Sequence, residues 1–284
     1  MLKKIFFAAA LLLASELGAK PVVIASIAPV EYLAKAVGGD KIEVQSLAKG
    51  DVHSYEPKPN DMKAVAKARI FIAAGLEFEE AWIPRFKASA KNLVVVKSDA
   101  KIAKLKEERG EQAEHDEKHE AHADPHVWLN PMLAITMARN ISDALIDMDK
   151  ANKDFYLENF QKLMNDLLAF DESAKNELAG LKNRKFVVYH PAWGYFAEHY
   201  DLEQISIERS GKEPKIDEMA STLKMIKDEN IKVIFADPNR SQKSAQILAS
   251  QTGAKVELLD PLGYNLLENL KIAVGAIKDA NSPK

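Results

Sequence analysis

Short apolar runs rich in valine and isoleucine alternate along this chain with longer segments whose apolar residues recur at helical spacing. Each run is short enough for one strand, and apolar strands separated by helices are typical of parallel sheets covered on both faces. We therefore predict an α/β protein of two similar lobes, each built on a four-stranded, mainly parallel sheet. The predicted strands are Val22–Ile27, Ile42–Leu47, Ala68–Gly75, Leu93–Lys97, Lys185–His190, Leu202–Glu208, Val233–Asp237 and Val256–Asp260.

A different pattern separates the two halves. From about Pro131 to Leu181 there is no strand-like run and no glycine before Gly180, and apolar residues follow helical spacing over several turns. We predict a helix over about 132–148 and one long helix over about 153–181 that joins the lobes. The expected organisation is an N-terminal lobe over 20–130, a linking helical segment over 131–182 and a C-terminal lobe over 183–284. A helical connector is stiff, so we expect small adjustments between the lobes.

The first 19 residues follow the pattern of a secretion signal. Lys3 and Lys4 precede an apolar run from Ile5 to Ala14, and the small residue Ala19 ends the segment. The run is too short to span a bilayer comfortably, which favours a cleaved signal over a retained anchor or a buried helix. The chain has no cysteine, which excludes disulfides, thiolate ligands and a lipid-carrying cysteine. We expect a periplasmic protein without a lipid anchor.

Four residues with metal-binding side chains lie where predicted strands end. They are His53, His126, His190 and Asp260. Ligands of parallel α/β sheets bind beyond the carboxyl ends of the strands, so all four could converge in the cleft between the lobes. Three imidazoles and one carboxylate suit a tetrahedral zinc ion. Each residue alone has an ordinary structural explanation, such as a rigid loop or an Asp-Pro turn, and the argument rests on their combination.

The motifs around these residues carry a family resemblance. The segments HSYEPKPND, DPHVWLNP and YHPAWGYFAEHYDL, with the long linking helix between the last two, resemble the periplasmic metal-binding proteins of bacterial ABC transporters for zinc and manganese. The resemblance runs from about Pro21 to the C-terminal helix. It implies two α/β lobes joined by a long helix, one metal between them, and ligands at His53, His126, His190 and Asp260. It also implies a membrane permease as the partner.

The identity of the metal depends mainly on position 190. Family members that resemble manganese carriers have glutamate there, and those that resemble zinc carriers have histidine. His190 therefore favours Zn²⁺, because imidazole suits zinc whereas carboxylate and water suit manganese. Some zinc-binding relatives have an acidic residue directly before the first histidine, where this chain has Val52. Asp260 or a water molecule is left as the fourth ligand.

A segment of abruptly different composition covers 107–124. It is strongly acidic, has almost no apolar residues, and contains His115, His119 and His122. One interpretation is a solvated loop that buries too little surface to become ordered. The other is an auxiliary zinc-gathering loop, as in the histidine-rich insertions of zinc-binding relatives. Three histidines make a short loop of this kind, so we expect it to play a secondary role.

Several functions compete at this point. The leading hypothesis is a monomeric, non-enzymatic carrier that delivers zinc to an ABC permease, and a manganese or iron carrier is the alternative. A zinc hydrolase would also use three histidines, but Asp260 would fill the open position that such an enzyme needs. The absence of a lipid anchor and of a low-complexity stalk argues against an adhesin. The formal charge of −3 is spread without a basic stripe, so we expect no nucleic-acid partner.

Overall fold

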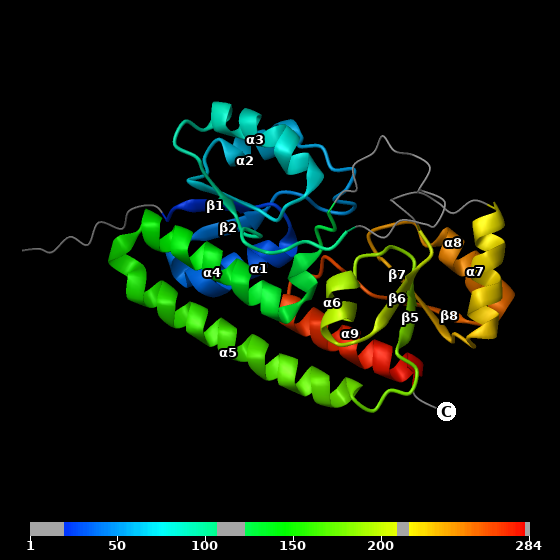
Figure 1. Ribbon diagram of the computed structural model, residues 1–284. Coiled ribbons are helices and arrows are strands. Elements are labelled where there is room, and N and C mark those ends of the chain that lie inside the picture. The colour runs from blue at the N-terminus through cyan, green and yellow to red at the C-terminus, as the bar shows by residue number, and fades with distance from the viewer. Residues whose placement is uncertain (1–19, 107–122, 209–215, 282–284) are drawn as a thin grey trace, which may run out of the picture.

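The computed structural model describes residues 20–106, 123–208 and 216–281. Two parallel sheets of four strands lie in separate lobes, and long helices run beneath both (Figure 1). The expected signal segment 1–19 lies outside the described residues, as do His115, His119 and His122.

The two sheets have the same strand order. The first contains β1 (Val22–Ala25), β2 (Glu43–Ser46), β3 (Ile70–Ala73) and β4 (Val94–Lys97), in the order β2-β1-β3-β4. The second contains β5 (Lys185–Val188), β6 (Glu203–Ser206), β7 (Val233–Ala236) and β8 (Lys255–Leu258), in the order β6-β5-β7-β8. All neighbouring strands are parallel. The predicted fold class is confirmed.

The apolar character of each strand matches its place in the sheet. The internal strands β3 and β7 are buried at every position, whereas the edge strands β2, β4 and β8 are mostly exposed or half-buried. Central strands of parallel sheets are covered on both faces, so they need continuous apolar sequences. The covering helices are α1 (Ala28–Gly38), α2 (Pro59–Val65), α3 (Glu77–Ser89), α6 (Gly194–His199), α7 (Ile216–Asp228), α8 (Lys243–Thr252) and α9 (Leu266–Asn281).

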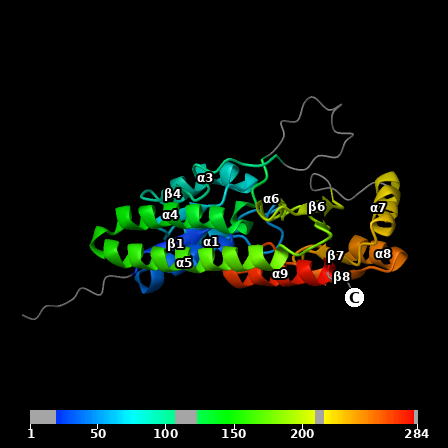
Figure 2. The same cartoon turned by 60° about the horizontal axis from the view of Figure 1, so that its bottom comes forward.

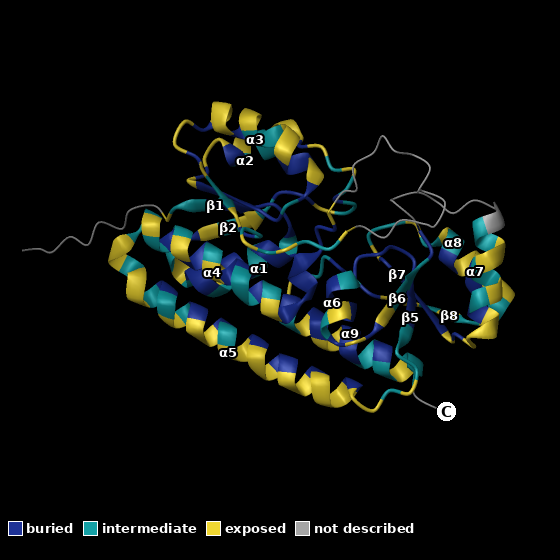
Figure 3. Cartoon of the chain, viewed as in Figure 1, coloured by how far each residue is buried: buried dark blue, intermediate teal, exposed yellow. Residues whose placement is uncertain are grey.

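Two consecutive helices connect the lobes. α4 covers Pro131–Met148 and α5 covers Lys153–Leu178, close to the predicted bounds. α5 packs against α1, α4 and α9 and so contacts helices from both halves of the chain (Figure 2). One side of α5 is buried along its length and the other is exposed (Figure 3). The buried residues are Tyr156, Phe160, Leu163, Leu167, Phe170, Asp171, Ala174 and Leu178.

One hydrophobic core extends through both lobes. It includes residues of the first sheet, the inward face of α5, helix α9, and Phe186 and Phe235 from one face of the second sheet. A smaller cluster lies on the other face of the second sheet, beneath α7 and α8. The shared core supports the expectation that the lobes move little relative to each other.

No helix in the part of the chain that the structure describes is both long and apolar enough to cross a membrane.

Candidate metal centre

His126 lies in a segment held by local hydrogen bonds at the start of α4. The Asp124 carboxylate accepts hydrogen bonds from the backbone N–H of His126 at 2.9 Å, and it contacts His126 Nδ1 at 2.8 Å. A buried 3-10 turn, Val127–Leu129, follows. Asn130 then caps α4, its Oδ1 accepting from the N–H of Met132, and Pro131 occupies the first turn. The helix start therefore fixes the position of the histidine.

His126 does not lie at a strand end, contrary to the prediction. The chain leaves β4 at Lys97, and His126 precedes a 3-10 turn that enters α4. The connection between β4 and α4 brings His126 beside His53 and His190. The prediction was wrong about the local structure, because the last strand before His126 among the described residues is β4, which ends far upstream at Lys97.

His53 is held on the irregular connection between β2 and α2. The Asp51 carboxylate accepts from the backbone N–H of His53 at 3.2 Å. Further along the loop, Asp61 Oδ2 accepts from the N–H of Lys58 at 2.7 Å and from the Tyr55 hydroxyl at 2.8 Å. These bonds fix a loop that has no regular secondary structure.

His190 lies two residues beyond the end of β5 and is 8% exposed. Its Nδ1 lies 3.1 Å from Glu208 Oε2 and 3.1 Å from Arg240 Nη1. Because arginine can only donate, the arrangement that satisfies every donor has His190 Nδ1–H and Arg240 both donating to Glu208. Nε2 of His190 is then the nitrogen with a free lone pair.

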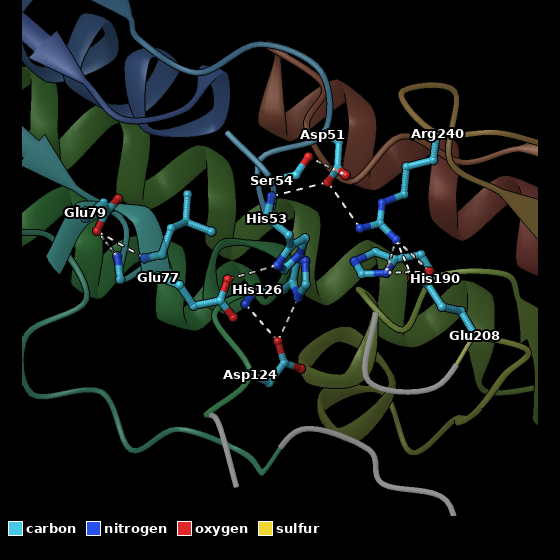
Figure 4. Close-up of polar contacts among 12 residues, drawn as sticks. Asp51, His53, Ser54, Glu77, Glu79, Asp124, His126, His190, Glu208 and Arg240 are labelled. Atoms are coloured by element: carbon cyan, nitrogen blue, oxygen red, sulfur yellow. Dashed lines mark hydrogen bonds and ion pairs between the residues drawn. The ribbon is translucent and has the colours of Figure 1, made fainter. Parts of the chain in front are cut away.

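The three histidines converge from both lobes (Figure 4). Their ring centroids are 5.3 Å apart for His53 and His126, 5.1 Å for His53 and His190, and 5.3 Å for His126 and His190. One nitrogen from each ring lies within 4.8 Å of the other two. Nitrogens bound at about 2.0–2.1 Å to a tetrahedral zinc lie roughly 3.3 Å apart. A small contraction would therefore suffice for all three to bind one ion.

Each ring has a carboxylate beside its Nδ1. Asp124 and Glu208 are within hydrogen-bond distance of His126 and His190, and Glu77 lies 3.5 Å from His53 Nδ1. His53 Nε2 is buried without a hydrogen-bond partner among the described residues. A carboxylate on one imidazole nitrogen, with the other nitrogen left for the ion, is the usual arrangement of metal-binding histidines. The donor set fits a zinc ion.

Asp260 does not join this group. Among the described residues, the set whose ligand atoms lie within 4.8 Å of one another consists of the three histidines. Oδ1 of Asp260 instead accepts from Asn239 Nδ2 at 2.8 Å and from the N–H of Leu262 at 2.8 Å. Its predicted role as the fourth ligand remains a prediction.

Burial keeps His190 in the neutral, metal-binding form at neutral pH. Burial is the largest cause that lowers the pKa of His190 from 6.5 to about 4. The bond to Glu208 opposes this shift, and the nearby His126, Arg240 and His53 lower the pKa further. Burial alone would raise the pKa of Glu208, but its bonds to His190 and Arg240 hold that pKa below the usual value. At neutral pH the site therefore offers a neutral imidazole beside an ionised carboxylate.

Residues 23–280 match the family described as zinc-uptake complex component A, periplasmic, abbreviated ZnuA. The chain belongs to the ZnuA family. It is 30% identical over 284 residues to the high-affinity zinc uptake system protein ZnuA of Bacillus subtilis (strain 168), covering 93% of this chain and 88% of that protein.

Solved ZnuA structures share the fold. A crystal structure of ZnuA superimposes with a TM-score of 0.86 at 35% identity, over 93% of this chain and all of the other (100%). A zinc-bound ZnuA with residues 138–173 of its own sequence deleted gives a TM-score of 0.86 at 34% identity, over 93% of this chain and 99% of the other. The predicted family resemblance and fold are confirmed.

Sequence reasoning assigned no role to the residues that surround the three histidines. Glu208 follows β6 by two residues, so the rule of looking beyond strand ends could have identified it. Arg240 follows β7 and could have been identified in the same way. Asp51 carried no signal of its own, because an acidic residue before a turn is ordinary in any loop.

Proposed function

We propose that this chain captures one Zn²⁺ in the periplasm and delivers it to the membrane permease of an ABC-type importer. The observation that carries the proposal is the convergence of three histidines from two lobes, each with a carboxylate beside Nδ1. Nε2 of His53, His126 and His190 would bind the ion. Asp260, after a change of its hydrogen bonds, or a water molecule would complete a tetrahedral site.

Zinc is favoured over manganese by the chemistry of the ligands. Three imidazole nitrogens suit zinc, whereas manganese prefers carboxylate and water oxygens. Glu208 and Asp124, which could have supplied oxygens, are already engaged with the Nδ1 atoms of His190 and His126. The nitrogen-rich set is therefore the one presented to the ion.

The same contacts argue for a carrier rather than a hydrolase. A zinc hydrolase needs a general base close to the metal-bound water. Asp124 and Glu208 contact ring nitrogens, so their role is to orient imidazoles. We propose that the mature chain is a monomer, released by cleavage of the 1–19 segment, that binds and releases its ion without chemical change.

The proposal is tested by zinc stoichiometry and by transport. The purified mature protein should retain one zinc after dialysis, and His53→Ala, His126→Ala and His190→Ala should each lose it. His199→Ala is the control, because His199 contacts Asp171 on α5 and not the three histidines. Only zinc-retaining variants should restore zinc-limited growth to a bacterium that lacks its own zinc-binding component. Retention of tight zinc by all three alanine variants would contradict the proposal.

A further inference from the structure

Arg240 joins the two lobes beside the three histidines. It lies in the connection between β7 and α8, and its Nη1 donates to both Glu208 oxygens, at 2.7 and 2.6 Å. Its Nη2 donates to Asp51 Oδ1 at 3.1 Å, and Asp51 belongs to the first lobe (Figure 4). One guanidinium therefore holds a carboxylate from each lobe.

Each of the two carboxylates also contacts a different one of the histidines. Glu208 Oε2 contacts His190 Nδ1, and Asp51 Oδ1 accepts from the backbone N–H of His53. The links form one continuous series from His190 through Glu208, Arg240 and Asp51 to His53. The Glu208 side chain is 5% exposed and the Arg240 side chain 15%, so the inner part of the series is shielded from water.

We infer that Arg240 is a positioning residue. It holds His53 and His190, which come from different lobes, at the spacing that zinc binding requires, and thereby slows the release of zinc. The inference rests on the proposed function, because it concerns the same site. Arginine suits this role since its planar fork can donate to two carboxylates at once, whereas an ammonium is a single point charge.

An electrostatic effect of Arg240 on the ion and a positioning effect on the histidines predict opposite changes in zinc release for Arg240→Ala. A cation beside the site repels Zn²⁺, so a pure charge effect would slow zinc release in Arg240→Ala and speed it in Asp51→Asn. If the bridge positions the ligands, both substitutions speed release, because each breaks the same series. The double variant should then be no faster than the faster single variant, since the second substitution removes a link that is already broken.

The experiment measures zinc dissociation from the full mature protein into an excess of chelator. We expect Arg240→Ala and Asp51→Asn each to release zinc about tenfold faster, because loss of a group that orients metal-binding histidines typically weakens metal binding by about 10–100-fold. Arg240→Lys keeps the charge and should also release zinc faster, by a smaller factor. Lys243→Ala removes an exposed cation three residues further along and should match the wild type.

The outcomes separate this inference from the proposed function. The inference would be overturned if Arg240→Lys and Asp51→Asn released zinc at the wild-type rate, or if Arg240→Ala and Asp51→Asn changed the rate in opposite directions. The proposed function would still stand in either case, provided that the wild type binds zinc. A wild-type protein that bound no zinc would overturn both. Urea unfolding of each variant identifies any that fail to fold, and Arg240→Lys, the mildest change, then decides the question.

Discussion

At the scale of single residues, we expect the carboxylates beside the rings to determine how tightly the three histidines bind an ion. Asp124 is the clearest case, because it contacts both the backbone N–H and Nδ1 of His126 and is buried. Its bond to Nδ1 holds the ring in one orientation and leaves Nε2 as the free nitrogen.

Asp124→Asn should therefore weaken zinc binding about 10–100-fold while the fold is kept. The amide can still accept from the backbone N–H, but it binds the imidazole N–H less strongly than a carboxylate does. Competition with a chromophoric chelator measures the affinity. Asp143→Asn, the same change on the exposed side of α4, should have no effect. Equal affinities in both variants would show that Asp124 does not orient His126.

His190 makes the stability of the metal-free protein depend on pH. Its pKa is about 4 when folded, against 6.5 for an ordinary histidine. Between these values the unfolded chain binds a proton that the folded protein does not, so the free energy of unfolding falls as pH decreases from 6.5 to 4. The contribution of this group is at most about 3 kcal/mol.

Urea unfolding of metal-free protein at several pH values tests this coupling. The wild type should lose more stability between pH 6.5 and 4 than His190→Gln, which has no imidazole to protonate at this position. The comparison is needed because acidic residues with lowered pKa values, such as Glu208 and Asp171, destabilise the protein in the same direction. Parallel pH profiles in the two proteins would contradict the assignment.

The sequence revealed the histidines but not their surroundings. His53, His126 and His190 could be predicted because imidazole in a proline-rich loop or at a strand end is conspicuous. The orientation of Asp260 could not, since it depends on Asn239, which lies 21 positions away and donates to both Asp237 and Asp260. Contacts of this kind follow from tertiary structure and leave no local pattern.

At the scale of elements, α5 stabilises the whole molecule through one face. Leu167 is fully buried against the shared core, whereas its neighbour Leu168 is 40% exposed. The helix was predictable to within three residues because its apolar positions recur so regularly over several turns. All eight strands were predictable because each is a short apolar run, although seven of the eight C-terminal ends were placed one or two residues too far along.

Leu167→Ala should lower the free energy of unfolding by about 2–5 kcal/mol, from lost burial and the cavity left behind. Leu168→Ala makes the same chemical change on the next residue and should lower it by less than about 0.5 kcal/mol. Urea denaturation of both variants measures the difference. Similar losses in both would mean that α5 does not present its predicted face to the core.

At the scale of the whole molecule, histidines from two lobes converge on one candidate site while a single core and a linking helix hold the lobes together. Trp128 Nε1 donates to the Pro261 carbonyl at 2.8 Å, and the Tyr195 hydroxyl donates to the Asp124 carbonyl at 2.7 Å, so bonds also cross between the halves near the histidines. We therefore expect the site to be largely formed before the ion arrives, and we expect zinc binding to need only a small contraction of the three rings.

The central claim is that these histidines select one zinc ion. Native mass spectrometry of the mature, metal-stripped protein, offered equal zinc and manganese, tests it most directly. We predict one tightly held zinc in the wild type and none in His190→Ala. Preferential binding of manganese, or retention of zinc by His190→Ala, would contradict the account.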